Sequence, residues 1–92
     1  MNIFAGTGKI IDVNLNSKVL KFNLANEQGK PCLIPCVLFD TSDEVRNFIE
    51  QLQTSGQVVW LQGRVSSYEY EYNGKTIRKI QVISNASIIK TI

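Results

Sequence analysis

The sequence predicts an all-β fold, a barrel of five strands with one short helix between the third and fourth strands. Three observations support this fold class. Five runs of residues have the apolar pattern of strands, whereas a single segment at 41–56 has the spacing of a helix. The last two runs are long and are joined by Asn73-Gly74, a pair typical of hairpin turns. For 92 residues we expect one domain, 1–92, around one small core.

The first two runs are separated by a short turn. Gly6 and Gly8 interrupt the first run, residues 3–13, and predict a bend or a bulge where the sheet coils tightly. A turn at 14–17, built from Asn, Leu and Ser, leads to the second run at 19–24. One face of this second run carries Leu20, Phe22 and Leu24, and the other carries Val19, Lys21 and Asn23.

The third run, residues 32–39, follows a loop at 26–31 that contains glycine and proline. Because Pro35 has no amide proton, we expect it at a sheet edge or at a bulge. Alternation divides the rest of the run between two faces, with Ile34, Cys36 and Leu38 on one and Pro35, Val37 and Phe39 on the other.

The segment after the third run has the strongest helical pattern in the chain. Thr41 and Glu44, three residues apart, form a capping box, and acidic residues in the first turn suit the helix dipole. Gly56 is placed to end the helix. One apolar stripe follows the helical spacing, namely Val45, Phe48, Ile49 and Leu52. We expect this helix to cover the core and to carry no functional residue.

The fourth and fifth runs, residues 57–72 and 75–85, are predicted to form a long hairpin. Both positions of a type I′ turn need positive φ, which Asn73 and Gly74 tolerate. This register pairs Tyr72 with Lys75, Tyr70 with Ile77 and Tyr68 with Lys79 on one face. The other face pairs Glu71 with Thr76, Glu69 with Arg78, Ser67 with Ile80 and Val65 with Val82, and we assign its barrel end to the core. Three strands, a helix and two strands are the element order of an OB-fold, a Greek-key barrel.

Three tyrosines interleaved with two lysines on one hairpin face indicate a surface for single-stranded nucleic acid. Aromatic rings stack on bases, at roughly 1–3 kcal/mol per base, and cations meet the phosphates. The competing interpretation is that tyrosines are good strand formers that pack across strands. Trp60 lies between Val59 and Leu61, so it is either an outward stacking platform or a half-buried residue of the core or an interface.

Composition excludes several classes of function. The net charge of +2 is weak, so any phosphate-binding surface must come from local clustering of basic residues. The absence of histidine argues against an enzyme or a metal site.

The two cysteines are not expected to form a disulfide, because in one strand Cys32 and Cys36 would lie about 13 Å apart. There is no apolar run of about 18 residues and no signal peptide, so we expect a cytoplasmic protein. We expect no cofactor.

Several ordered motifs resemble bacterial single-stranded DNA-binding proteins. They are GQVVWLQGR at 56–64, YEY at 68–70, NGK at 73–75, IQV at 80–82, KFNLA at 21–25, IPCVLF at 34–39 and GKI at 8–10. The resemblance covers nearly the whole chain. It implies an OB-fold that binds single-stranded DNA in replication, recombination or repair and assembles as a dimer or tetramer. In this family an aromatic residue in the place of Phe39 stacks on DNA, and a basic residue in the place of Lys9 lies near it.

The binding residues expected from pattern and resemblance together are Lys9, Phe39, Trp60, Arg64, Tyr68, Tyr70, Tyr72, Lys75, Arg78 and Lys79. Stacking alone does not separate DNA from RNA. The family's usual members end in a disordered acidic tail that recruits repair and replication proteins. This sequence stops at Ile92, so either it is trimmed or the protein lacks that recruiting function. A tail-less domain is also the form of the primosomal replication protein N. The alternative function is therefore a primosomal or replication accessory domain, in which the tyrosines contact replication-restart or repair proteins.

Overall fold

The computed structural model describes residues 2–15, 18–26 and 32–92. Residues 16–17 of the predicted turn and 27–31 of the predicted loop therefore lie outside the described residues. The elements, in chain order, are β1 (Ile3–Asn14), β2 (Leu20–Asn26), β3 (Cys32–Leu38), α1 (Asp43–Ser55), β4 (Val58–Tyr72), β5 (Lys75–Ser84), the 3-10 turn η1 (Ala86–Ile88) and β6 (Lys90–Thr91).

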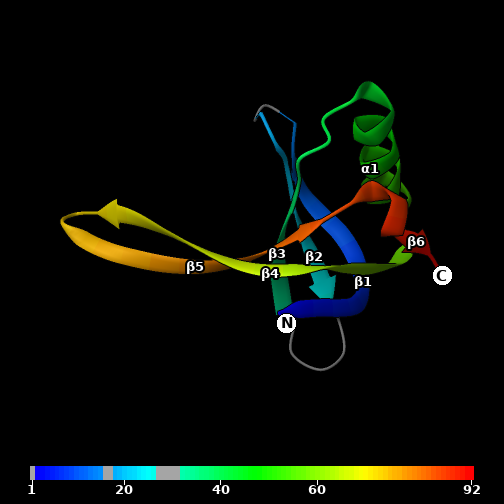
Figure 1. The fold of residues 1–92 in the computed structure, drawn as a ribbon. Helices are drawn as coiled ribbons and strands as arrows, with labels where there is room; N and C mark the ends of the chain where they lie inside the picture. The colour runs from blue at the N-terminus through cyan, green and yellow to red at the C-terminus, as the bar shows by residue number, and fades with distance from the viewer. Residues whose placement is uncertain (1, 16–17, 27–31) are drawn as a thin grey trace.

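The sheet closes on itself as a barrel. Its strand order is β1-β2-β3-β5-β4-β6, and an additional pairing of β1 with β4 completes the circle. β3 and β5 are parallel, and the other pairs are antiparallel. Figure 1 shows α1 at one end of the barrel and a long hairpin of β4 and β5 projecting from its side. The predicted fold class, an OB-fold with a helix between the third and fourth strands, is confirmed.

β1 bends because it serves two neighbours. Lys9 pairs both with Val58 of β4 and with Ala25 of β2, so the strand changes partner there. The pairing with β4 runs without a break across Gly6 and Gly8, so the expectation of a bulge at these glycines is wrong. Gly8 leaves no room for a side chain, because a Cβ there would lie 2.5 Å from the carbonyl oxygen of Ala25.

The register irregularity of β1 lies further along, between Ile11 and Asn14. Asp12, within this stretch, has a φ of 56°, in the left-handed region that Asp tolerates better than most residues. The irregularity of β1 therefore lies at Asp12, where the sequence analysis predicted no bulge.

The core is filled by alternate residues of the barrel strands, as the pattern predicts. The most deeply buried apolar side chains are Ile10, Leu20, Leu24, Leu38, Ile49, Leu61, Val59 and Cys36. Val37 is the exception: it lies on the outer face of β3 and is nevertheless only 4% exposed. Pro35 precedes the stretch in which β3 pairs with β5, so it stands at a sheet edge, as expected.

α1 begins one residue later than the capping box predicts. Ser42, not Thr41, is the N-cap: its hydroxyl accepts from the Val45 amide at 3.4 Å, and its carbonyl accepts from the Arg46 amide at 3.0 Å. The Thr41 carbonyl is used instead by the Arg46 side chain, whose Nε donates to it at 3.0 Å.

The other end and the apolar side of α1 agree with the sequence. Gly56 ends the helix with a φ of 66° and donates its amide to the Leu52 carbonyl. Ile49 and Leu52 are buried, and Val45 and Phe48 pack on the core at its margin. In the part of the chain that the structure describes, no helix is long and apolar enough to cross a membrane.

The β4-β5 hairpin has the predicted turn and register. Asn73 and Gly74 have φ values of 52° and 75°, as a type I′ turn requires. All the predicted cross-strand pairs are present. We call residues 67–80 the arm, because every one of them except Ile77 is exposed.

One assignment on the hairpin is wrong. Val82 is buried and Val65 is half-buried, so the Glu69 side does reach the core at its barrel end. Ile80, however, is 61% exposed, and Ser67 opposite it is exposed as well. The core side ends at the Val65–Val82 pair because the arm has left the barrel by the next pair.

Candidate nucleic-acid interface

A single strand carries half of the predicted binding residues on one side. The pairing of β4 with β1 and with β5 has no register break, so its side chains alternate without interruption. Val59 and Leu61 are fully buried, and the even-numbered positions therefore face outward. The predicted site residues on this outer side of β4 are Trp60, Arg64, Tyr68, Tyr70 and Tyr72.

The tyrosines of the arm form an open aromatic surface. The ring centroids of Tyr68 and Tyr70 are 6.2 Å apart at an interplanar angle of 25°, an offset stack. Lys79 Nζ lies 5.9 Å from the centroid of the Tyr70 ring, within cation–π range. All three tyrosines are exposed. The rings of Tyr68 and Tyr70 thus pack on one another and not in the core, and the exposed surface of all three rings remains accessible.

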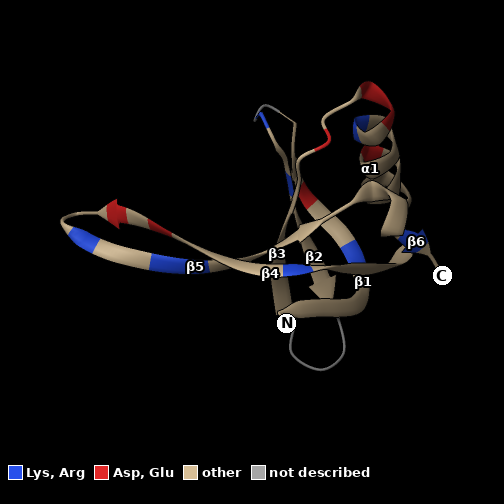
Figure 2. Cartoon of the chain, in the orientation of Figure 1, with Lys and Arg blue, Asp and Glu red and all other residues tan. Residues whose placement is uncertain are grey.

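Charge divides along the arm by strand. Figure 2 shows the basic residues of the arm on β5 and its acidic residues on β4. Lys75 and Lys79 are paired directly with tyrosines, on the aromatic side. Arg78 is on the opposite side, where its Nε donates to Glu69 Oε1 at 3.0 Å. Arg78 is therefore the predicted residue of the arm that the structure turns away from the rings.

Trp60 lies at the other end of the outer side of β4, about 26 Å along the strand from Tyr68. It is half-buried, between Thr7 of β1 and Lys90 of β6. Lys9 pairs with Val58, one diagonal step from Trp60. Sequence analysis missed Lys90, because the pairing of β6 with β4 is what brings it beside Trp60.

The remaining two predicted residues stand singly. Arg64 is exposed midway along β4, with Ile3 on one side and Ile83 on the other. Phe39 directly follows β3 and is 61% exposed. The ten predicted residues are thus spread over the barrel and the arm, and the closest grouping is Tyr68, Tyr70 and Lys79.

A groove lies where the arm leaves the barrel, and we call it the root groove. Its volume is about 240 Å³. The residues that line it are Asp12, Asn14, Lys21, Phe22, Asn23, Pro35, Cys36, Val37, Tyr68 and Gln81. Only Tyr68 of these belongs to the predicted site. Alternation had placed Lys21, Asn23 and Val37 on outer faces, but nothing local showed that Tyr68 would lie beside them.

Known proteins resemble this chain in fold but not in sequence. No family model matches the sequence, and no curated protein matches it either. Among solved structures, the Plasmodium falciparum SSB in complex with ssDNA has a TM-score of 0.72 at 17% identity, over 100% of this chain and 95% of that one. The mitochondrial single-stranded DNA-binding protein Rim1 of S. cerevisiae has a TM-score of 0.73 at 16% identity, over 99% and 94%.

The chain has the fold of the single-stranded DNA-binding proteins. The resemblance seen in the sequence is confirmed at the level of this fold. The two matched proteins come from Plasmodium and from yeast mitochondria, so the likeness is not specific to bacterial members.

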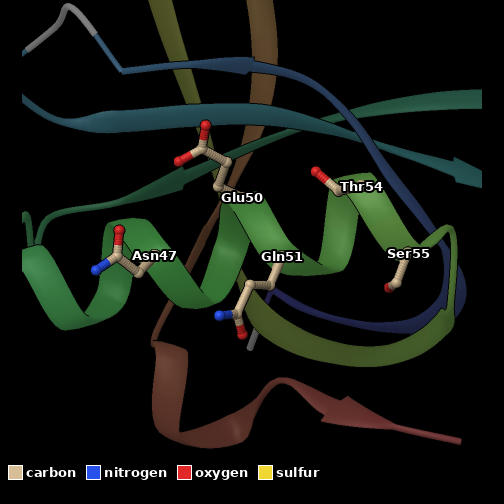
Figure 3. A pocket seen from close by; sticks show the side chains of 5 residues that line it. All are labelled: Asn47, Glu50, Gln51, Thr54 and Ser55. Atoms are coloured by element: carbon tan, nitrogen blue, oxygen red, sulfur yellow. The ribbon is translucent and has the colours of Figure 1, made fainter.

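A second hollow, of about 590 Å³, lies along α1, and the residues that line it are of polar types. It is lined by Asn47, Glu50, Gln51, Thr54 and Ser55, whose side chains Figure 3 displays along the helix. It offers neither an aromatic ring nor a cation. It therefore lacks both features that a single strand needs.

The two cysteines are free and differ in their surroundings. Cys32 is exposed at the start of β3, whereas Cys36 is in the core. Burial raises the pKa of the Cys36 thiol to about 12, and a hydrogen bond with the Leu24 backbone opposes this only in part. Cys36 is therefore a protonated, unreactive thiol at neutral pH. Within the described residues, no three His, Cys, Asp or Glu side chains are grouped to hold a metal ion.

Proposed function

We propose that this chain binds single-stranded DNA, largely without regard to sequence, as one domain spanning residues 1–92. The observation that carries the proposal is the exposed stack of Tyr68 and Tyr70 with Lys79 beside it, on an arm that contributes little to the core. The fold supports it, since one matched structure is an SSB in complex with ssDNA.

In the mechanism we propose, the strand follows the arm and continues over the outer side of the barrel. Bases stack on the tyrosines, and each stacked base contributes on the order of 1–3 kcal/mol. Lys75 and Lys79 lie opposite tyrosines and meet the phosphates of the same nucleotides. Stacking depends on no particular base edge, which accounts for the tolerance of sequence along the arm.

The other predicted residues lie further along the same proposed path, where they are more widely spaced than the tyrosines of the arm. Arg64 offers a cation midway along β4, and Phe39 offers an exposed ring beyond β3. Trp60, with Lys9 and Lys90 nearby, forms the far end of the proposed path. Arg78 contributes little to this path, because its guanidinium is turned to the opposite side of the arm and bonds Glu69.

The cellular setting is part of the same proposal. We propose a binding protein and not an enzyme, acting in DNA replication, recombination or repair as a dimer or tetramer. Two free thiols suit a reducing compartment, so we place the protein in the cytoplasm. Replication-restart or repair proteins are the partners expected beside a second copy of the chain.

The test is a salt titration with fluorescently labelled oligonucleotides. Single-stranded DNA, RNA and duplex DNA are compared in parallel, with Trp60 emission as a second readout. We expect single strands to bind and affinity to fall with salt, with a logarithmic slope of roughly −0.7 per phosphate contacted. Absence of single-strand binding even at low salt would contradict the proposal.

Paired variants connect the binding to the rings. Tyr70→Ala removes a stacking platform and should weaken binding by about 1–3 kcal/mol. Thr76→Ala, on the opposite face of the same arm, is the matched control and should bind as the parent does. If Tyr68→Ala and Tyr70→Ala both leave DNA affinity unchanged, the tyrosines instead serve a protein partner, as the accessory-domain alternative requires.

A further inference from the structure

The root groove has the dimensions of a site for one nucleobase. Pockets that take drug-sized molecules usually measure about 300–1,000 Å³. The root groove, at about 240 Å³, is smaller, and it is shared by the arm and the outer faces of β1, β2 and β3. It therefore suits a single flat ring system turned out of the strand.

The walls of the groove suit the flat faces of such a ring. Tyr68 forms one wall, and its ring is supported from behind by the stacked ring of Tyr70. Pro35 and Val37 supply an apolar floor. Val37 is only 4% exposed, so most of the apolar surface that this floor offers to a ligand comes from Pro35, which is exposed. A base leaving the tyrosine stack would reach this surface without losing its aromatic contact.

The polar end of the groove is rich in hydrogen-bond acceptors. Asn23 Nδ2 donates to Asp12 Oδ2 at 3.0 Å, which holds the carboxylate in place. The side-chain oxygens of Asp12 and Asn23 retain acceptor capacity beyond this bond. Gln81 adds an amide from the arm side. The Asp12 carboxylate accepts hydrogen bonds and donates none, so a ligand edge that binds it must present donors.

On the basis of the function proposed above, we propose that the root groove takes one guanine base of the bound strand. The Watson–Crick edge of guanine presents two adjacent donors, N1–H and an N2 amino hydrogen, and a carboxylate such as Asp12 accepts both. Cytosine and adenine present one amino group beside an acceptor. Thymine presents a single N–H between two carbonyl oxygens, which the carboxylate repels.

The charge of Asp12 makes the groove selective. A carboxylate beside a phosphodiester chain disfavours binding unless donors from the base compensate for it, and a repulsive element of this kind is a common source of specificity. Lys21 also lines the groove and can meet the phosphate of the same nucleotide. The groove thus adds one base preference to a path that is otherwise tolerant of sequence.

The test uses thymidine oligonucleotides in which one central residue is dG, dI or dT. A two-donor match to a carboxylate predicts that the dG strand binds at least about fivefold more tightly than the dT strand. Inosine lacks the N2 amino group, so the dI strand should lose most of this gain. Equal affinities for dG and dT strands would overturn the inference and leave the proposed function standing. If no strand binds, the proposed function itself fails.

Two carboxylate variants assign the preference to the groove. Asp12→Asn removes the charge while keeping an acceptor for Asn23 and a side chain that tolerates the left-handed φ of 56°. It should bring dG and dT strands to within about twofold of each other, without weakening the dT strand. Glu71→Gln removes a carboxylate from the other face of the arm and should keep the preference. Retention of the preference in Asp12→Asn would overturn the inference.

Discussion

The barrel and the arm share two strands, β4 and β5, but are held together by different forces. Within the barrel, Val59, Leu61 and Val82 are almost completely buried. In the arm, residues 67–80, all but Ile77 are exposed. The alternation of β4 continues unbroken from one region to the other, so the outer side of the barrel becomes the aromatic side of the arm. The barrel is stabilised by burial, and the arm by its turn and cross-strand pairs, which leaves the rings of the arm for a ligand.

Truncation of a core side chain should give the largest difference in unfolding free energy between the barrel and the arm. Leu61→Ala removes a fully buried side chain and should lower the free energy of unfolding by about 2–5 kcal/mol. Tyr70→Ala, on the arm, should lower it by less than about 1 kcal/mol. Urea unfolding followed by Trp60 fluorescence measures both. Similar losses in the two variants would show that the arm contributes to the core after all.

The next effect concerns a glycine in the barrel. A Cβ at Gly63 would lie 2.5 Å from the Ile83 carbonyl oxygen and 2.6 Å from Val82 Cγ1. Gly63→Ala should therefore force β4 and β5 apart and destabilise the fold by about 1–3 kcal/mol. The midpoint of thermal unfolding reports this change. A midpoint equal to that of the parent would mean that the two strands adjust freely at this position.

A glycine in the arm should behave differently. A Cβ at Gly74 meets nothing within 4 Å, but the φ of 75° strains any residue with a side chain. Gly74→Ala should cost about 1 kcal/mol, confined to the turn and the ends of the arm. Amide hydrogen exchange should accelerate at Tyr70 and Ile77 and stay unchanged at Val59 and Val82. Acceleration in the barrel strands would contradict an arm that opens independently.

The smallest effect is expected for the ion pair of the arm. Arg78 and Glu69 are both well exposed, so their salt bridge should contribute less than about 1 kcal/mol, and less still at high salt. The measurement is a double-mutant cycle with Arg78→Ala and Glu69→Ala. A coupling well above this value would indicate that the pair, and not the turn, sets the register of the arm.

The register of the arm was predictable because its causes are local. Asn73-Gly74 selects the turn, and a two-residue turn leaves one pairing for every residue up to Val65. Burial of Leu20, Phe22 and Leu24 followed from alternation in the same way. One local feature, the start of α1, was predicted one residue too early. Thr41 and Ser42 both have N-cap chemistry, and the choice fell to Ser42, with the carbonyl of Thr41 bonded by Arg46.

The amino-acid sequence was sufficient for the OB-fold order of elements, the aromatic face of the arm and the separation of Glu69 and Arg78 from it, because each depends on residues close along the chain. The root groove and the setting of Trp60 depended on folding in three dimensions. The parallel pairing of β3 with β5 joins segments more than 40 residues apart, and it brings Val37 to the foot of the arm near Tyr68. Alternation gives the face on which a side chain lies, but closure of the barrel decides which faces meet.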